Sequence, residues 1–188
     1  MAAIGTACLE DPMTTLAQQL RDTIRDVPDF PKPGILFKDI TTLLADPVLF
    51  SATVDAFADQ WSTSGIDVVV GMESRGFLFG APLAMRLSAA FVPARKPGKL
   101  PYDKISTSYE LEYGTNTLEL HTDAVKPGDR VLVIDDLLAT GGTAKATVDL
   151  CQQLGGTVVA CGFVVELAFL PGRAALDGID VFSLVTFD

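Results

Sequence analysis

The chain is poor in histidine and cysteine. It has one histidine and three cysteines among 188 residues. Cys8, Cys151 and Cys161 are widely spaced and form no Cys-x-x-Cys pattern. Neither a disulfide framework nor a zinc site is therefore expected, and a reducing, cytoplasmic setting fits best. The only histidine, His121, follows a short predicted strand and is expected to be structural or exposed.

Long apolar runs and positive charge are also scarce. No segment approaches the ~20 apolar residues that a membrane span requires, and the N-terminus lacks the pattern of a signal peptide. The 24 acidic residues outnumber the 14 basic residues, which gives a net charge of −10. This balance argues against nucleic acid or an anionic membrane as the main partner. We expect one domain over residues 1–188 that is neither exported nor bound to a membrane.

The most informative segment is residues 131–143, which read Val-Leu-Val-Ile-Asp-Asp-Leu-Leu-Ala-Thr-Gly-Gly-Thr. Val131–Ile134 is expected to be a buried parallel strand because it is a short, continuous apolar run rich in β-branched residues. Asp135 and Asp136 then stand at its carboxyl end, where open α/β sheets bind ligands. A helix that begins after the Gly-rich turn would offer N–H groups and a positive dipole end to a phosphate. The segment therefore predicts a sugar-phosphate site.

Each residue type in this turn has a physical role. Gly141 and Gly142 let the backbone approach phosphate oxygens, while the hydroxyls of Thr140 and Thr143 can donate to phosphate or cap the helix. The carboxylates suit ribose hydroxyls. A Walker-type nucleotide loop would need Lys after the second glycine, and none is present. A plain turn with a helix cap stays the structural alternative.

The rest of the chain alternates between helical and strand patterns. Apolar spacing predicts helices at 16–27, from 46–47 towards 61, and at about 77–87. Short apolar runs predict strands at 35–37, 67–71, 90–94, 117–120, 158–166 and 181–185. Residues 1–13 show no clear pattern, and we expect part of them to be disordered. The alternation predicts an α/β fold whose central, mostly parallel, twisted sheet is flanked by helices.

Residues 96–116 have no strong period. A loop of this length inside a compact domain is usually functional. Around its beginning, four of the 14 cations fall within ten positions: Arg95, Lys96, Lys99 and Lys104. In an acidic protein this suggests a small anionic ligand, and a solvated run of charge is an equal alternative.

Residues 131–143 closely resemble the phosphoribosyl diphosphate (PRPP) signature of type I phosphoribosyltransferases. Four more segments, spread over nearly the whole chain from residue 28 onward, are similar to the members that act on adenine. The resemblance implies that family's fold, with a small N-terminal hood at 28–46 and a mobile loop at 96–116. It implies transfer of 5-phosphoribose from PRPP to adenine, giving AMP and diphosphate in purine salvage. It also implies a homodimer and Mg²⁺, held mainly by PRPP and water.

The resemblance assigns roles residue by residue. The 5-phosphate and ribose are bound by Asp135, Asp136, Ala139, Thr140, Gly141, Gly142 and Thr143. Diphosphate is bound by Glu73, Ser74, Arg75, Arg95 and Lys99, with a strained or cis peptide between the first two. Adenine is contacted by Leu36, Phe37, Lys38, Arg75 and Leu167. Without the resemblance, 35–37 would be interpreted as core and 73–76 as an ordinary turn.

Two of these assignments need comment. Many family members have Arg where this chain has Lys38, and Lys cannot reproduce the planar fork of Arg. Glu112 matches the loop glutamate that transfers a proton with the purine, and Tyr113 accompanies it. The residues alone cannot choose Glu112 over Glu110 or Glu119, nor decide whether N7 or N9 is its partner.

Three rival functions share some of these features. A phosphoribosyltransferase for a 6-oxopurine or orotate would share residues 131–143 without this hood or the Glu-Tyr-Gly loop. A non-catalytic PRPP-binding regulator would usually need a DNA-binding module, for which the chain has neither a basic face nor spare length. An α/β domain that binds another sugar phosphate would differ in its response to Mg²⁺-PRPP and to ribose 5-phosphate.

Overall fold

The computed structural model describes residues 12–110 and 115–188. The chain divides into two compact units, Met1–Ala52 and Thr53–Asp188. The boundary falls inside helix α3 (Pro47–Trp61), whose bounds confirm the predicted helix from Pro47 to Trp61. Within the described ranges, no helix combines the length and apolar character that a bilayer crossing requires.

The N-terminal unit is a short helical pair joined to a hairpin. Its helices are α1 (Pro12–Thr23) and α2 (Thr41–Leu44), and its antiparallel strands are β1 (Arg25–Pro28) and β2 (Leu36–Asp39). The predicted helix at 16–27 was wrong beyond Thr23, because Val27 pairs with Phe37 across the hairpin. Leu20 and Leu43, both fully buried, belong to the core of this unit.

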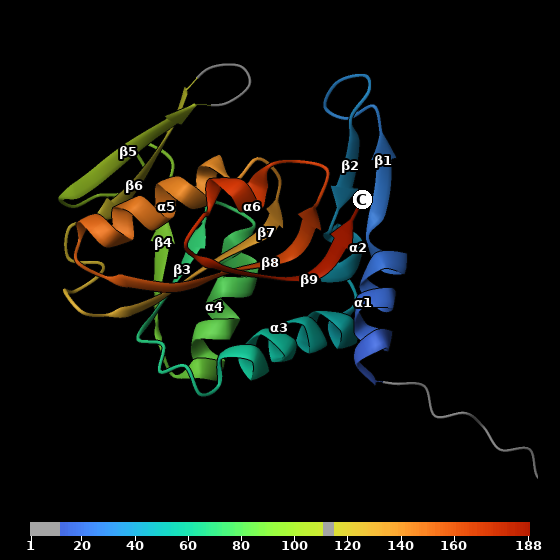
Figure 1. Cartoon of the computed structure of the whole chain (residues 1–188), viewed down its shortest axis with the longest axis horizontal. Coiled ribbons are helices and arrows are strands. Elements are labelled where there is room, and N and C mark those ends of the chain that lie inside the picture. Colours follow the sequence, from blue (N-terminus) through green and yellow to red (C-terminus); the bar gives the residue numbers. More distant parts are fainter. Residues whose placement is uncertain (1–11, 111–114) are drawn as a thin grey trace, which may run out of the picture. The chain divides into compact units, whose positions relative to one another are not determined.

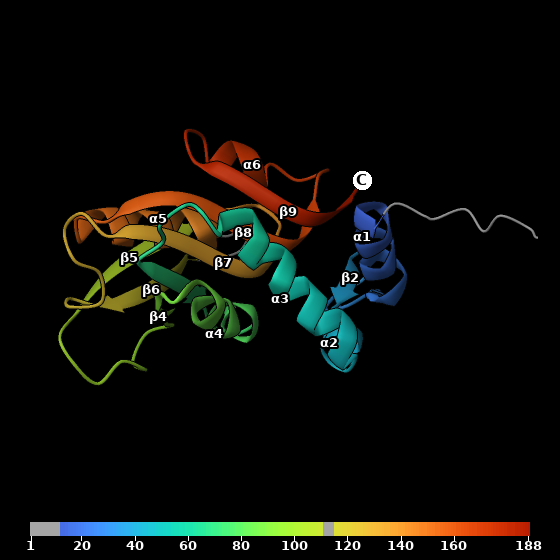
Figure 2. The same cartoon turned by 90° about the horizontal axis from the view of Figure 1, so that it is seen from below.

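The C-terminal unit is built on a five-stranded sheet in the order β4-β3-β7-β8-β9, with every neighbouring pair parallel. The strands are β3 (Val68–Met72), β4 (Ala90–Ala94), β7 (Arg130–Leu138), β8 (Thr157–Leu167) and β9 (Asp180–Phe187). Figure 2 shows β4 and β9 at opposite edges. The predicted parallel α/β sheet is confirmed.

Helices cover both faces of this sheet. Figure 1 shows the sheet nearly edge-on, with α5 (Gly142–Gln153) and α6 (Gly172–Ala175) on one side and α4 (Gly76–Leu87) on the other. The inward stripe of α5 includes Cys151, and Cys161 lies in β8. Burial raises the pKa of each thiol to about 12, and both cysteines behave as small apolar residues of the core.

A hairpin lies where a long loop was predicted. Strands β5 (Lys104–Glu110) and β6 (Thr115–His121) pair antiparallel, so the prediction of no strand in 96–116 was wrong for 104–110. In β5 the half-buried Ile105 and Thr107 alternate with exposed neighbours, which is the period of a half-covered strand. This signal is weak because one of the two inward side chains is polar. Residues 111–114, including Glu112 and Tyr113, lie outside the described residues.

Candidate active site

A tight turn connects β7 to α5. Strand β7 continues through the acidic pair to Leu138, four residues beyond the predicted end at Ile134. Gly141 then adopts φ +82° and forms the N-cap of α5, and no side chain caps the helix. The alternative role of the Thr140 and Thr143 hydroxyls as caps is therefore not seen. The first turn of α5 presents its N–H groups to the turn, as a phosphate requires.

This turn encloses a small cavity. It measures ≈80 Å³, and all residues from Ala139 to Thr143 line it together with Asp135 and the apolar walls of Met72 and Phe163. A larger cavity of ≈380 Å³ is lined by the ends of α3 and α4 and contains none of the predicted site residues. All residues assigned to the 5-phosphate and ribose except Asp136 thus line one small cavity.

The environment of Asp135 and Asp136 in β7 disfavours their ionised forms. Asp136 is 2% exposed, and its N–H donates to Oδ1 of Asp135 at 2.9 Å. Burial raises the pKa of Asp135 well above its usual value, and the charge of Asp136 adds to this. Burial also raises the pKa of Asp136, against the opposing charge of Arg75. Arg75 Nε lies 3.0 Å from Asp136 Oδ2, yet this oxygen has no hydrogen bond with the described residues.

A second turn, between β3 and α4, packs against the first. The peptide between Glu73 and Ser74 is cis, as the resemblance implied. Ser74 is exposed and Arg75 is half-buried. A Cβ atom on Gly76 would lie 2.5 Å from the carbonyl oxygen of Ile134, so only glycine lets this turn approach strand β7 so closely. The residues assigned to diphosphate therefore lie beside those assigned to ribose.

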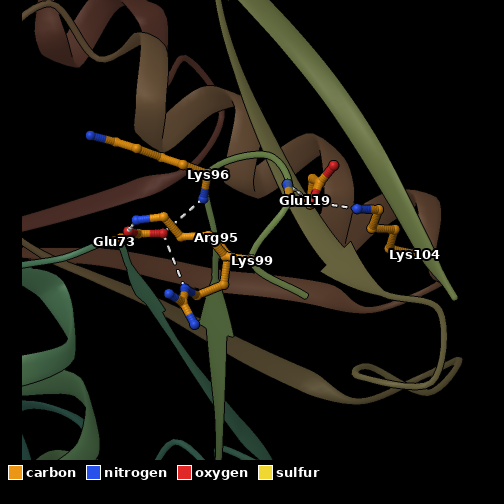
Figure 3. Close-up of polar contacts among 7 residues, drawn as sticks. Glu73, Arg95, Lys96, Lys99, Lys104 and Glu119 are labelled. Atoms are coloured by element: carbon orange, nitrogen blue, oxygen red, sulfur yellow. Dashed lines mark hydrogen bonds and ion pairs between the residues drawn. The ribbon is translucent and has the colours of Figure 1, made fainter. Parts of the chain in front are cut away.

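Glu73 forms ion pairs with two cations of the basic segment, which we define as residues 95–99 (Figure 3). Its side chain is 7% exposed and accepts hydrogen bonds from Arg95 Nε at 3.1 Å, the backbone N–H of Lys96 at 2.9 Å, and Lys99 Nζ. Burial alone would raise the pKa of Glu73, but these hydrogen bonds outweigh it and lower the pKa from 4.5 to about 2. The cluster contains two cations and one carboxylate.

A second buried carboxylate holds the same segment from the other side. Glu119 of β6 accepts from Lys104 Nζ at 2.9 Å and from the N–H of Gly98 at 3.2 Å (Figure 3). Its backbone also pairs with that of Arg95 in both directions. Sequence reasoning missed this role, because a glutamate between two apolar strand residues is expected to face solvent.

The residues assigned to adenine belong to both units. In the N-terminal unit, Leu36 is 49% exposed, and Phe37 meets Phe30 edge-on with ring centroids 5.1 Å apart. Lys38 is buried, and its Nζ lies 2.5 Å from Oδ1 of Asp26, so its ammonium is held within the hairpin. In the C-terminal unit, Leu167 ends β8 and is half-buried.

Comparisons with known proteins identify the family of this chain. The phosphoribosyl transferase domain family matches residues 39–174. An adenine phosphoribosyltransferase of Yersinia pseudotuberculosis is 57% identical over 177 residues, which cover 92% of this chain and 95% of that protein. The fold is that of the type I phosphoribosyltransferases.

Two solved structures extend the likeness. Adenine phosphoribosyltransferase from Thermoanaerobacter pseudethanolicus has a TM-score of 0.89 and 51% identity, over 91% of this chain and 99% of that chain. The enzyme from Saccharomyces cerevisiae, complexed with adenine and an imino-altritol bisphosphate, has a TM-score of 0.86 and 42% identity over the same shares. The chain therefore belongs to the phosphoribosyltransferase family and, within it, to the adenine phosphoribosyltransferases.

Proposed function

We propose that this protein transfers the 5-phosphoribosyl group of PRPP to adenine, giving AMP and diphosphate in purine salvage. The bond from C1 of ribose to the diphosphate oxygen breaks, a bond from C1 to N9 of adenine forms with inversion, and the purine loses a proton. Family membership supports the proposal. The geometric observation that carries it is the uncapped turn of residues 139–143, here named the phosphate turn, beside the acidic pair of β7.

The phosphate turn binds the 5-phosphate through backbone N–H groups and hydroxyls. Ala139, Gly141 and Gly142 contribute backbone, while Thr140 and Thr143 contribute hydroxyl donors. Asp135 and Asp136 accept hydrogen bonds from the ribose hydroxyls. Their raised pKa values support this role, because two crowded carboxylates with few donors gain when a ligand brings donors to them.

Diphosphate binds at the turn of Ser74 and Arg75 and at the cations of the basic segment, Arg95 and Lys99. As the bond at C1 breaks, negative charge grows on the leaving group, so positioned cations stabilise the transition state more than the substrate. Glu73 keeps these cations in place through its hydrogen bonds. Catalysis on this side is therefore electrostatic and needs no covalent bond to the protein.

Mg²⁺ fits the residues present. Asp135 and Asp136 are hard oxygen donors, and Oδ2 of Asp136 accepts no hydrogen bond from the described residues. Among those residues no group of three or more His, Cys, Asp or Glu side chains could hold a metal ion by itself. We therefore assign the ion mainly to PRPP and water, with the two aspartates nearby. When bound, it supplies positive charge to the leaving diphosphate.

Adenine is held by apolar contacts and backbone groups. In the N-terminal unit Leu36 presents backbone groups for the edge of the base and Phe37 an aromatic face, and in the C-terminal unit Leu167 offers an apolar side chain. Because the ammonium of Lys38 is paired with Asp26, we assign only the backbone of Lys38 to contact with adenine. Glu112 takes the purine proton, with Tyr113 beside it in the loop. Glu112→Ala should lower turnover by about 10² or more and leave PRPP binding nearly intact.

A homodimer in the cytoplasm completes the proposal. In the family the basic segment contributes to diphosphate binding partly across a dimer interface, and Arg95 and Lys99 match that segment. The free, buried thiols of Cys151 and Cys161 fit a reducing compartment. Light scattering of the purified protein, at concentrations from micromolar downward, tests the dimer.

One assay tests substrate and reaction together. The protein is incubated with PRPP, Mg²⁺ and each natural nucleobase in turn, and nucleotide and diphosphate are measured. We expect AMP and diphosphate in equal amounts, formed from adenine alone. Nucleotide formed from a 6-oxopurine or orotate would contradict the substrate. PRPP binding without any turnover would instead identify a non-catalytic regulator.

A further inference from the structure

One ion pair, between a buried carboxylate and a half-exposed guanidinium, involves none of the residues assigned above. Glu166 of β8 is 5% exposed and accepts two hydrogen bonds from Arg173 of α6, from Nε at 2.6 Å and from Nη2 at 2.8 Å. The third nitrogen, Nη1, donates to the carbonyl oxygen of Val181 at 3.1 Å. The hydrogen bonds from Arg173 lower the pKa of Glu166 against the opposing effect of burial. The guanidinium thus joins α6 to two strands, β8 and β9.

The other side of α6 touches the phosphate turn, and here the contact is backbone against backbone. A Cβ atom on Gly141 would lie 2.6 Å from the carbonyl oxygen of Gly172 and 2.8 Å from Cβ of Ala175. A Cβ atom on Gly172 would lie 2.5 Å from the carbonyl oxygen of Ala139. These close contacts leave no room for a layer of flexible side chains between α6 and the turn, so a shift of α6 must move the turn.

These contacts close a ring. In the sheet, Leu138 of β7 lies opposite Glu166 of β8. Leu138 leads directly into Ala139 of the phosphate turn, which touches Gly172 of α6, and the next residue, Arg173, binds back to Glu166. We infer that the Glu166–Arg173 pair is a positioning pair that sets the shape of the phosphate turn and thereby the affinity for PRPP. This inference rests on the proposed function.

The pair is suited to positioning more than to stability. Helix α6 has only four residues, too few to hold its own place. The planar fork of Arg173 fixes both distance and orientation relative to Glu166, which a single ammonium contact would not. Because the side chain of Arg173 is 55% exposed, solvent screening limits what the pair adds to global stability.

The adenine side is held separately. Leu167 follows Glu166, but it pairs with Phe187 of β9, and the N–H of Ala168 donates to the carbonyl oxygen of Phe187 at 2.9 Å. These backbone bonds do not involve α6. Loss of the ion pair should therefore disturb PRPP binding and leave adenine binding largely unchanged, which a merely structural defect would not do.

The test compares Arg173→Met and Arg173→Lys with Arg86→Met. The last variant removes an exposed pair with Asp55, 3.0 Å long, from the helix on the opposite face of the sheet. Steady-state KM values for PRPP and adenine, calorimetry with Mg²⁺-PRPP, and melting temperatures are measured for each. We expect Arg173→Met to raise the PRPP KM about tenfold, with the adenine KM within about twofold of wild type. Arg173→Lys should fall between, and Arg86→Met should match wild type in both KM values.

The outcomes separate two failures. If the wild type neither binds Mg²⁺-PRPP nor forms AMP, the proposed function fails and this inference fails with it. If the wild type is active and Arg173→Met keeps the wild-type PRPP KM, or raises both KM values equally, the inference alone is wrong. Should Arg173→Met not fold, Arg173→Lys decides, because it keeps the charge. A lysine variant that also unfolds shows a purely structural role and overturns the inference.

Discussion

The adjacent strands β3 and β7 each carry an acidic residue near the carboxyl end, and the pKa values of the two are shifted in opposite directions. The pKa of Glu73, directly after β3, is lowered to about 2, whereas that of Asp135 in β7 is raised well above its usual value. Burial disfavours the ionised carboxylate and by itself would raise the pKa of both residues. The difference lies in the neighbours, since Glu73 receives three hydrogen bonds and Asp135 faces a second carboxylate.

This contrast distinguishes the two halves of the proposed active site, the diphosphate side and the phosphoribosyl side, by how their charges are balanced. The diphosphate side is complete before substrate arrives, because its carboxylate and cations already satisfy one another. The phosphoribosyl side is incomplete, because its acids crowd together and its helix start is uncapped. A site of the second kind costs stability in the free protein and gains it when a ligand supplies the donors. Substitutions at the two sides should therefore differ in sign as well as in size.

The largest effect is expected at the phosphate turn. Gly141→Ala would place a methyl group 2.6 Å from the carbonyl oxygen of Gly172 on a backbone with φ +82°. We expect the strained backbone to lower the free energy of unfolding by about 1–3 kcal/mol. The displaced turn should lower PRPP affinity by roughly 100-fold or more. Gly178→Ala is the matched control, since its φ is +80° and nothing lies within 4 Å. Equal PRPP affinity for the two variants, measured by calorimetry, would show that the close contact is unimportant.

The next effect tests the sign of the contrast. A carboxyl group whose pKa is raised on folding stabilises the protein below its unfolded pKa, and that stability is lost as the pH rises through the folded value. Near neutral pH, Asp135→Asn should therefore raise the melting temperature of the free protein. It should also weaken PRPP binding by about 2 kcal/mol, because a charged acceptor for ribose is lost. A lower melting temperature with unchanged binding would assign Asp135 a structural role.

Much of this arrangement could be predicted from short stretches of sequence. The strand, acidic pair and glycine turn of 131–143 lie together in the chain, so their local order predicts both the sheet position and the phosphate site. The cis peptide at Glu73 was implied only by the resemblance, because no local pattern requires it. The burial of Asp136, which is 2% exposed, was not evident from the sequence, because β7 continues four residues past the apolar run that ends at Ile134.

Long-range ion pairs could not be predicted. Glu73 and Lys99 are 26 positions apart, and Glu119 reaches Lys104 only through the hairpin that was interpreted as a loop. Glu166 lies in an apolar run, so its partner Arg173 becomes evident only when α6 is placed. In each case a buried carboxylate needs a cation, but the sequence does not show which one.

A smaller effect is expected from Thr140, whose side chain is exposed at the phosphate turn. Thr140→Val keeps the shape and removes one hydroxyl donor. PRPP affinity should fall by about 1.5 kcal/mol, roughly tenfold, which is typical of a hydrogen bond to a charged group. Thr157→Val, an exposed change at the start of β8, is the control and should leave the affinity unchanged. If both variants bind PRPP as the wild type does, the hydroxyl of Thr140 does not contact the phosphate.

The smallest effect belongs to the proposed diphosphate side and disappears in acid. A carboxyl group with a lowered pKa adds stability above its unfolded value of 4.5, and this stability is lost as the pH falls towards about 2. Because Arg95 and Lys99 are 30% and 47% exposed, we discount the full linkage value to about 1 kcal/mol. Glu73→Gln should therefore be less stable than the wild type near neutral pH, and the two should converge below pH 4.5.

Urea unfolding of both proteins between neutral pH and pH 3 measures this convergence, with Asp149→Asn as the control for an exposed ion pair on α5. The control should run parallel to the wild type over the same interval, because an exposed pair contributes little. Together with Asp135→Asn, the experiment makes the same carboxylate-to-amide change at two neighbouring strands and expects opposite signs at neutral pH. If both amide variants shift stability in the same direction, the difference in construction between the two halves of the site is wrong.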